Sequence, residues 1–211
     1  MKKIAVGMSL MMALCASGVA QAQNRMDNNM VGKMSKTAFD QKNKEGAATV
    51  SSITPTNTQL SSADQDLMMQ VAKGGMMQLE TSKIAVQKAS SQEVREFAQA
   101  EVDEQTGLSD KLKEIAAAKG VTLPSGPDAE LQDMLAKMQN MSGAELDKHY
   151  IQQHAVKGHE KIDQVMSMVR SQAKDSNLSA IEKAAHPLVK THLKVARDMQ
   201  SKMMSNNAGS R

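Results

Sequence analysis

The sequence predicts an all-α protein whose body is a four-helix bundle. Ala, Met, Leu, Gln, Glu and Lys dominate its periodic segments, whereas aromatic residues are rare, with two Phe, one Tyr and no Trp in 211 residues. Four long helical patterns begin where a Ser precedes a Glu or Gln by three residues, which is typical of helix N-termini: Ser62, Ser90, Ser142 and Ser179. Helices of about 24 to 30 residues would be about 36 to 45 Å long, which suits such a bundle.

The helical pattern breaks after the second long helix, where residues 119–127 contain two Gly and two Pro. These residue types end helices and favour turns. Residues 128–140 then show a short helical pattern, which we interpret as a helix that connects the second and third long helices. The bundle is therefore expected over residues 62–204, followed by a disordered tail at residues 205–211.

The first 22 residues have the order of a secretory signal peptide. Two Lys are followed by an apolar run over residues 4–19 and then by Ala20-Gln21-Ala22, with small residues at both recognition positions. The apolar run is too short for a membrane span, so we expect cleavage after Ala22, no transmembrane anchor and a periplasmic or secreted protein. Cleavage would also remove Cys15, the only cysteine, which excludes disulfides, thiolate metal ligands and thiol catalysis.

Residues 23–61 separate this segment from the bundle. They are rich in Asn, Gln, Lys, Ser, Thr and Gly, and their apolar residues are scattered without a sustained period. Such a segment buries too little apolar surface to offset the entropy lost on ordering. This composition predicts a flexible polar arm.

Composition and motifs also exclude several classes of function. Lys and Arg (26) nearly balance Asp and Glu (23), and there is neither a dense basic stripe nor a set of aromatic residues on which bases could stack. Nucleic-acid binding is therefore not expected. The chain lacks Gly-x-Ser-x-Gly, a Gly-Lys-Ser/Thr phosphate loop and His-Glu-x-x-His, so no catalytic residue is assigned and the sequence favours a protein that is not an enzyme.

Polar residues interrupt the apolar stripes of the predicted helices. Glu101 and Gln105 occupy the middle of the stripe on the second helix, and the third and fourth stripes contain His159 and His192. Glu80 lies one position from the edge of the first stripe. If the helices pack as neighbours, these five side chains would converge at mid-bundle, where such folds hold metal ions between facing helices.

Two interpretations of these five residues remain open. Imidazole and carboxylate groups are suitable ligands for a single transition-metal ion such as zinc, iron, copper or nickel. Alternatively, the side chains satisfy one another by hydrogen bonds and fix the register of the helices. The other histidines, His149, His154 and His186, are expected at the surface.

Methionine is unusually frequent, with 19 residues in the chain. Thioethers bind copper(I), and they also absorb oxidants as sulfoxides, so Met-based copper or oxidant handling is one hypothesis. The other is that flexible Met side chains fill a core that is poor in aromatic residues. The Met residues show no clustered binding motif, which favours core packing.

Several stretches resemble one known family. They include residues 71–75, 85–91, 93–99 and 117–124, and the similarity extends over roughly residues 62–202. These stretches are similar to the exported ferritin-like family catalogued as domain of unknown function 4142. The resemblance implies a ferritin-like four-helix bundle in the bacterial envelope and no established activity.

The chain departs from the pattern of that family at two positions. Gln105 stands where the pattern has a histidine, and Gly158 stands where it has an aspartate before His159. Two ligands or ligand-supporting groups are thus absent, whereas His159 and His192 match the pattern. Di-iron bundles also use two Glu-x-x-His units, and the chain has none, so any metal site is expected to hold a single ion.

These observations lead to two hypotheses of function. The first is a non-enzymatic envelope or stress-associated protein that binds an unknown protein partner, with an oligomeric state that the sequence leaves open. The second is a metal-binding protein with a single-ion site of His and Glu ligands. Copper or oxidant handling by the methionines is a further alternative.

Overall fold

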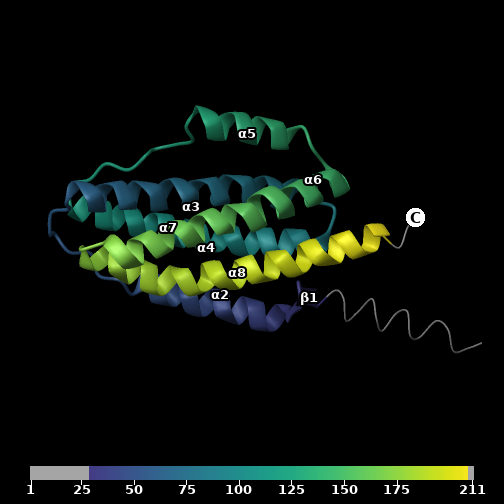
Figure 1. Cartoon of the computed structure of the whole chain (residues 1–211), viewed down its shortest axis with the longest axis horizontal. Coiled ribbons are helices and arrows are strands. Elements are labelled where there is room, and N and C mark those ends of the chain that lie inside the picture. The colour runs from purple at the N-terminus through teal and green to yellow at the C-terminus, as the bar shows by residue number, and fades with distance from the viewer. Residues whose placement is uncertain (1–28, 209–211) are drawn as a thin grey trace, which may run out of the picture.

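The computed structural model describes residues 29–208, and it is mainly helical (Figure 1). The predicted all-α class is confirmed. Within the described range the two strands, β1 (Met30–Val31) and β2 (Met34–Ser35), form a short antiparallel hairpin that turns at Gly32 with a positive φ of 63°, and an isolated parallel bridge joins Ala89 and Gly143. The predicted signal peptide at residues 1–22, the start of the predicted arm and the end of the predicted tail lie outside the described residues.

In chain order, the helices are α2 (Lys36–Ser51), α3 (Ser62–Lys88), α4 (Gln92–Ala118), α5 (Ala129–Gln139), α6 (Gly143–His149), the π-helix η1 (Tyr150–Val156), α7 (Lys157–Gln172) and α8 (Ser176–Ala208). Helix α3 contacts α4 and α7, α7 contacts α8, and α2 contacts both α4 and α8. Helix α2 therefore closes a ring between the second and last long helices (Figure 1). The predicted connecting helix corresponds to α5, which lies against α3 outside the ring.

Helix α2 corrects the prediction of a flexible arm over residues 23–61. Phe39 and Val50 of α2 are buried, and Phe39 stacks on Phe97 of α4 with ring centroids 6.0 Å apart. A Cβ atom on Gly46 would collide with Leu188 of α8, so the helix packs closely there. The three positions in α2 follow a spacing of seven and four residues, which places them on one helix face. A few well-placed contacts thus order a segment whose composition is polar.

The helix starts lie close to the predicted signals. The hydroxyls of Ser61 and Ser91 accept hydrogen bonds from the first turns of α3 and α4, each one residue away from the Ser that the sequence pattern indicated. Helix α8 begins at Ser176, three residues before the predicted Ser179, because Asp175 accepts hydrogen bonds from the amides of its first turn. Polar caps therefore begin these helices, but the cap residue depends on local geometry.

Two apolar clusters form the core, one toward each end of the long helices. The first includes Phe97, Tyr150 and Met138, and the second includes Met68 and Met166. These three methionines are at most 1 % exposed, as expected for core packing. Among the described helices, none combines the length and apolar composition needed to cross a membrane. Between the two clusters, every long helix contributes buried polar residues, and these form the candidate site.

Candidate metal centre

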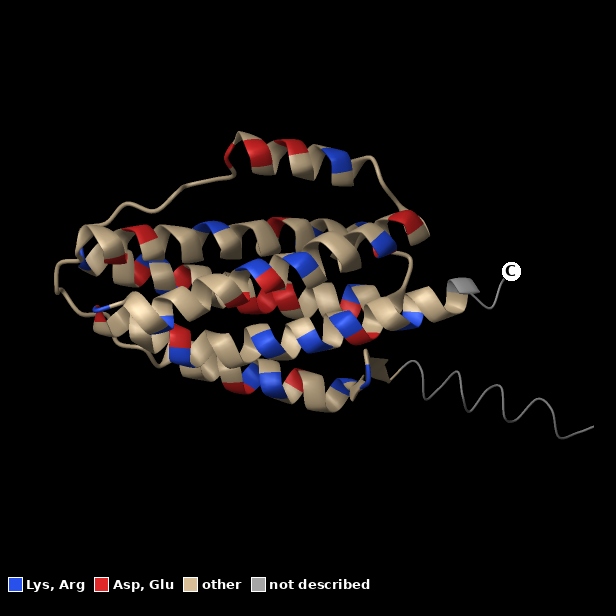
Figure 2. Cartoon of the chain, viewed as in Figure 1, with Lys and Arg blue, Asp and Glu red and all other residues tan. Residues whose placement is uncertain are grey.

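A layer of buried polar side chains lies at mid-length of the long helices. Glu101 and His192 are completely buried, His159 is 1 % exposed and Glu104 is 7 % exposed. Figure 2 shows the acidic stretch of α4 that contributes to this layer in the middle of the molecule. We refer to Glu101, Glu104, His159 and His192 as the buried centre.

Three elements bring these side chains together. Glu101 of α4, His159 of α7 and His192 of α8 offer ligand atoms that all lie within 4.8 Å of one another. His159 Nε2 lies 2.9 Å from Glu101 Oε1, and His192 Nδ1 approaches the same oxygen. Glu104 follows one turn after Glu101 on α4, and its Oε2 lies 3.1 Å from His192 Nδ1. The two imidazoles therefore face a pair of carboxylates.

The far nitrogen of each imidazole is held by an acceptor. His159 Nδ1 lies 2.7 Å from the carbonyl oxygen of Ala155, and His192 Nε2 lies 2.6 Å from Oδ1 of Asn43 in α2. The amide of Asn43 is itself oriented, because its Nδ2 donates a hydrogen bond to the carbonyl of Phe39. Since these acceptors require an N–H on the far nitrogen, the near nitrogen of each neutral ring presents a lone pair to Glu101. Metal-binding histidines are commonly oriented in this way.

The inward-facing atoms of the buried centre lack hydrogen bonds. Both carboxylate oxygens of Glu101 and Glu104, His159 Nε2 and His192 Nδ1 are buried without a hydrogen-bond partner of acceptable geometry, although some of these atoms are close to one another. Buried polar atoms are normally satisfied, so such a group of exceptions needs a physical explanation. A cation bound among them would satisfy all four side chains.

The charges of the buried centre shift its pKa values in different directions. Burial raises the pKa of Glu101, but the charges of His159 and His192 outweigh burial and hold its pKa far below the usual range. Burial and the charge of Glu101 raise the pKa of Glu104 to about 7. Burial lowers the pKa of His192, but Glu101 and Glu104 outweigh it and raise its pKa to about 9. In the metal-free protein, a proton on His192 therefore compensates the buried carboxylates at neutral pH.

The donor set fits a transition-metal ion. Zinc–nitrogen and zinc–oxygen bonds of about 2.0 to 2.2 Å place the ligands of a tetrahedral site roughly 3.4 Å apart. The ligand atoms lie within 4.8 Å of one another and the distance from His159 Nε2 to Glu101 Oε1 is 2.9 Å, so side-chain movements of less than about 1 Å reach that arrangement. Two imidazoles and one or two carboxylates are ligands of zinc and of non-haem iron(II), and the absence of sulfur in the set disfavours copper(I).

The π-helix η1 places His159 and leaves room for a supporting amide. The side chain of Gln78 in α3 donates to the carbonyl of His154 in η1 and lies 3.0 Å from His159 Nδ1. A Cβ atom on Gly158 would be 2.8 Å from Nε2 of Gln78, so glycine at this position makes room for the amide. π-helical turns are frequently found at functional sites. The aspartate of the family pattern is thus replaced by a glycine that fits Gln78.

Aromatic rings cover the two imidazoles on their apolar side. The ring centroid of Phe97 lies 6.2 Å from that of His159 and 5.6 Å from that of His192, and Phe39 lies 5.2 Å from His192. These rings exclude water and keep the local dielectric constant low. A charged ligand would therefore interact strongly with the buried centre.

The structure brings together only some of the residues that the sequence indicated. Glu101, His159 and His192 meet as expected, whereas the side chain of Glu80 is 30 % exposed and pairs with Lys83 at 2.7 Å. The prediction that Glu80 reaches inward is therefore wrong, because its side chain lies on the outer side of α3. Gln105 is buried, but its Oε1 is directed at Gly75 of α3.

Three residues of the site, Glu104, Asn43 and Gln78, were not predicted as ligands or supports. Glu104 could have been found from the Glu101-x-x-Glu104 spacing, which places both carboxylates on one face of a helix. Asn43 lies in the segment that composition assigned to a flexible arm, so no signal connected it to His192. The expected surface position of His154 and His186 is also wrong, since both are buried.

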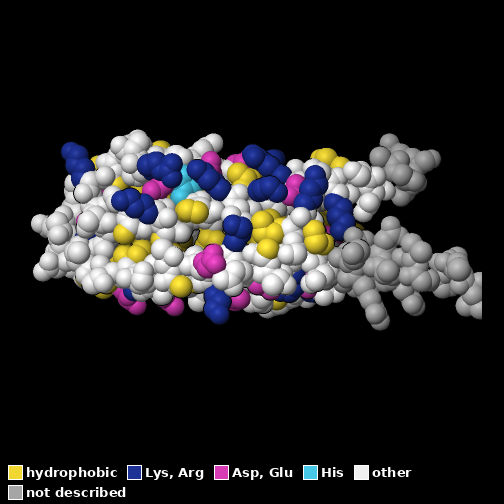
Figure 3. All heavy atoms as spheres, turned by 90° about the horizontal axis from the view of Figure 1, so that it is seen from below, with side chains coloured by type: hydrophobic (Ala, Val, Ile, Leu, Met, Phe, Trp, Pro, Cys, Tyr) yellow, Lys and Arg dark blue, Asp and Glu magenta, His cyan; other side chains and the backbone are white. Residues whose placement is uncertain are grey.

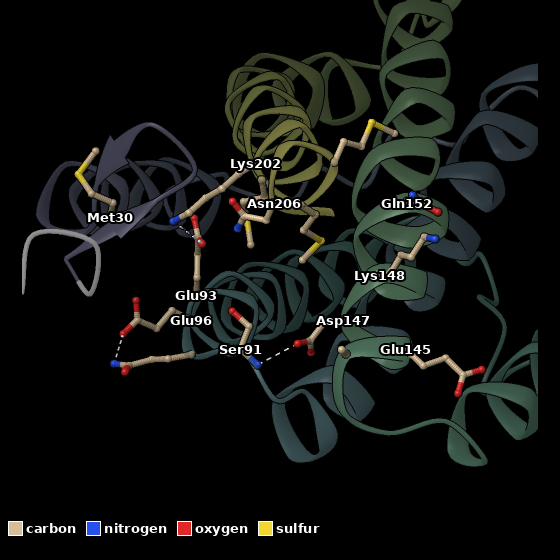
Figure 4. Close-up of a pocket in the computed structure, with 15 residues that line it drawn as sticks. Met30, Ser91, Glu93, Glu96, Glu145, Asp147, Lys148, Gln152, Lys202 and Asn206 are labelled. Atoms are coloured by element: carbon tan, nitrogen blue, oxygen red, sulfur yellow. Dashed lines mark hydrogen bonds and ion pairs between the residues drawn. The ribbon is translucent and has the colours of Figure 1, made fainter. Parts of the chain in front are cut away.

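Apart from the buried centre, a groove lies at the end of the molecule where α8 passes α4 and α6 (Figure 4). This end groove has a volume of about 810 Å³, and four of its lining residues are methionines: Met30, Met199, Met203 and Met204. Some of its charged groups have partners, since Lys202 pairs with Glu93 at 3.2 Å and Asp147 accepts a hydrogen bond from the amide of Ser91. Figure 4 shows these pairs at the wall of the groove.

The fold and the buried centre define an all-α protein with a carboxylate–histidine cluster between its long helices. Residues 49–199 match the model of the family described as Domain of unknown function (DUF4142), and the chain belongs to this family. The matched region contains the four residues of the buried centre, whereas Asn43 precedes it. Comparison with curated proteins and with solved structures gave no match.

Proposed function

We propose that the protein binds one transition-metal ion through Glu101, His159 and His192, with Glu104 as a fourth ligand. The observation that carries this proposal is the arrangement of the two imidazoles. Each has its far nitrogen held by an acceptor and its near nitrogen directed at a buried carboxylate without a hydrogen bond. Once a metal ion displaces the proton of His192, this arrangement presents lone pairs of both rings to one point between three helices.

Energetic reasoning supports a metal rather than a purely structural network. A buried polar atom without a partner costs about 1 to 3 kcal/mol, and more when it is charged. A network that serves only to fix register gains nothing from leaving its carboxylate oxygens without hydrogen bonds. A divalent cation turns the same atoms into ligands, and its charge offsets the two carboxylates.

The ligand set supports a single ion of zinc or iron(II) type. The centre has two carboxylates and two imidazoles, whereas a di-iron bundle requires four carboxylates and two imidazoles. Its ligands come from facing helices, as in the ferritin-like four-helix bundle that we propose for α3, α4, α7 and α8, with α2 added beside them. Because three ligands are at most 1 % exposed, we propose that the ion is held and not used on a substrate.

We further propose that this binding takes place outside the cytoplasm, in the bacterial envelope. The basic, apolar and small-residue order of residues 1–22 supports export. A protein that binds a metal ion there would contribute to tolerance of metal or oxidative stress.

The hypothesis of a protein partner draws on the end groove. Flexible methionines suit adaptable binding surfaces, and Met204 is 56 % exposed. However, Lys202, Glu93 and Asp147 there already have partners, and no polar side-chain atom of the groove is buried without a hydrogen bond among the described residues. The geometry therefore supports metal binding at the buried centre better than partner binding or methionine-based copper handling at the end groove.

Metal analysis of the purified mature protein tests the proposal. We expect about one ion per chain after reconstitution with Zn²⁺ or Fe²⁺, and we expect the His159→Ala/His192→Ala variant to bind none. His149→Ala serves as the matched control, because His149 lies in the same region without belonging to the centre. A folded wild-type protein that takes up no metal, or a double variant with unchanged metal content, contradicts the proposal.

A further inference from the structure

We propose that metal ions enter the buried centre through a groove between α2 and α4, with Glu104 at its inner end. This inference rests on the proposed function, because it concerns the route to the same centre. It assigns to α2, which lies mostly outside the family match, the role of one wall of the entry path.

The groove reaches from the surface to the centre. Its volume is about 450 Å³, and its walls are formed by Asp40, Asn43 and Ala47 of α2 and by residues of α4 that include Asp103 and Glu104. Both residues at its inner end touch the same ligand. Asn43 Oδ1 lies 2.6 Å from His192 Nε2, and Glu104 Oε2 lies 3.1 Å from His192 Nδ1. The groove and the buried centre therefore share a wall.

Glu104 is suited to pass a cation inward. It is more than nine-tenths buried, both of its carboxylate oxygens lack a hydrogen bond, and yet it lines the groove. Glu101, the next carboxylate, lies one helical turn away and faces both imidazoles. A cation bound first by Glu104 would thus have its next ligands within a few ångströms.

The charge of the groove favours cations. Four carboxylates line it, from Asp40, Glu96, Asp103 and Glu104, against two ammonium groups from Lys36 and Lys44. Lys36 is paired with Asp40 at 2.6 Å, which reduces its repulsion of an entering cation. Figure 3 shows the face of the molecule seen from below, where Lys and Arg side chains are numerous. The acidic lining therefore gives cations a local path across a surface that carries many positive charges.

The opposite side of α4 offers no equivalent route. A smaller hollow of about 290 Å³ between α3 and α4 reaches Gln105, but none of the four residues of the buried centre lines it. Glu80 and Lys83, which line its mouth, are paired with each other. Of these two hollows, the groove between α2 and α4 is thus the one that reaches a ligand of the centre.

Association kinetics test the entry path separately from binding itself. Zn²⁺ is mixed with the metal-free protein in a stopped-flow instrument with a chromophoric chelator as competitor, and the equilibrium affinity is measured by the same competition. Ala47→Trp places a large side chain in the groove, and we expect association and dissociation to slow by about 10-fold each with an unchanged Kd. Ala136→Trp, at an exposed alanine of α5, is the matched control and should leave both rates unchanged.

A charge variant keeps the test valid if the tryptophan perturbs folding. Asp103→Asn should slow association by about 2- to 3-fold at low salt and have little effect at high salt, because screening removes the attraction. Asp110→Asn, at an exposed acid of α4 outside the groove, is its control. Wild-type binding with unchanged rates in Ala47→Trp and Asp103→Asn overturns the entry path alone, whereas a wild-type protein that binds no Zn²⁺ overturns the proposed function.

Discussion

Helix α8 carries two buried histidines, His186 and His192, whose surroundings differ. His186 Nε2 lies 2.7 Å from Oδ1 of Asp163 and its Nδ1 lies 2.8 Å from Oε1 of Glu182. Glu182 also accepts a hydrogen bond of 2.7 Å from Arg170. No buried polar atom of this His186 cluster lacks a partner, whereas the inward-facing atoms of the buried centre all do.

The pKa values of Glu182 and Glu104 shift in opposite directions, although the pKa of Glu101 is lowered like that of Glu182. Burial raises the pKa of Glu182, but hydrogen bonds and charges from His186 and Arg170 outweigh burial, so that its pKa is lowered. The pKa of Glu104 is raised to about 7, because burial and the charge of Glu101 act together. The comparison teaches that a buried histidine with both nitrogens bonded serves stability, whereas one with a free inward nitrogen beside two carboxylates is suited to bind a cation.

The largest expected effect is the loss of metal binding when the shared carboxylate is neutralised. Glu101→Gln removes the ligand that faces both imidazoles, and we expect the Kd for Zn²⁺ to rise by at least about 100-fold. Glu182→Gln, the corresponding change in the His186 cluster, should leave the Kd unchanged. Isothermal titration of both variants measures this difference, and equal affinities would remove the distinction between the clusters.

A second prediction compares the removal of each histidine of α8. His186→Ala leaves Glu182 buried with fewer partners, and we expect it to lower the free energy of unfolding by about 3 kcal/mol without changing the metal content. His192→Ala should abolish metal binding, and it should also lower the stability of the metal-free protein, because it removes the proton that compensates Glu101 and Glu104. Urea denaturation with metal analysis distinguishes the two, and a loss of metal in His186→Ala would contradict this view.

The pH dependence of stability separates the two carboxyl groups. The pKa of Glu104 is higher in the folded state than its unfolded value near 4.5. The stability that protonation of Glu104 gives the folded protein is therefore fully present below about pH 4.5 and is lost as the pH rises through about 7. Glu104→Gln should therefore stabilise the metal-free protein by about 1 to 2 kcal/mol at pH 8 and have little effect at pH 4.

Glu182→Gln provides the opposite sign as a control. The pKa of Glu182 is lowered in the folded state. The stability that the ionised Glu182 side chain gives the folded protein is therefore present above about pH 4.5 and is lost as the pH falls. This variant should be less stable than the wild type at pH 7 and approach it at low pH. Chemical denaturation of the metal-free proteins at several pH values measures both effects, and the same sign in the two variants would refute the comparison.

The smallest expected effect concerns the residue that orients His192. Asn43→Ala removes the acceptor for His192 Nε2, and we expect the affinity for Zn²⁺ to fall by about 10-fold. Asn43→Asp retains an acceptor, so its affinity for Zn²⁺ should be close to that of the wild type. If Asn43 only fills space, Asn43→Ala and Asn43→Asp should have the same affinity. Competition with a chelator gives the Kd of each variant.

Helical periodicity was sufficient to predict much of this molecule. The apolar stripes indicated four long helices and a short connecting helix, and they singled out Glu101, His159 and His192 as polar residues on buried faces. The helical class and the burial of these three residues are confirmed, because the spacing of residues along a helix determines which side chains share a face. The glycines and prolines before α5 are local signals of the same kind.

Tertiary packing decided the rest. Helix α2 is ordered because Phe39 meets Phe97 and because Gly46 lets Leu188 approach, contacts between segments that no local pattern connects. The outward position of Glu80 and the contact of Asn43 with His192 depend in the same way on how helices are rotated against their neighbours. A periodic pattern identifies the buried face of a helix, but the identity of the group that packs against each residue is set only when the helices assemble.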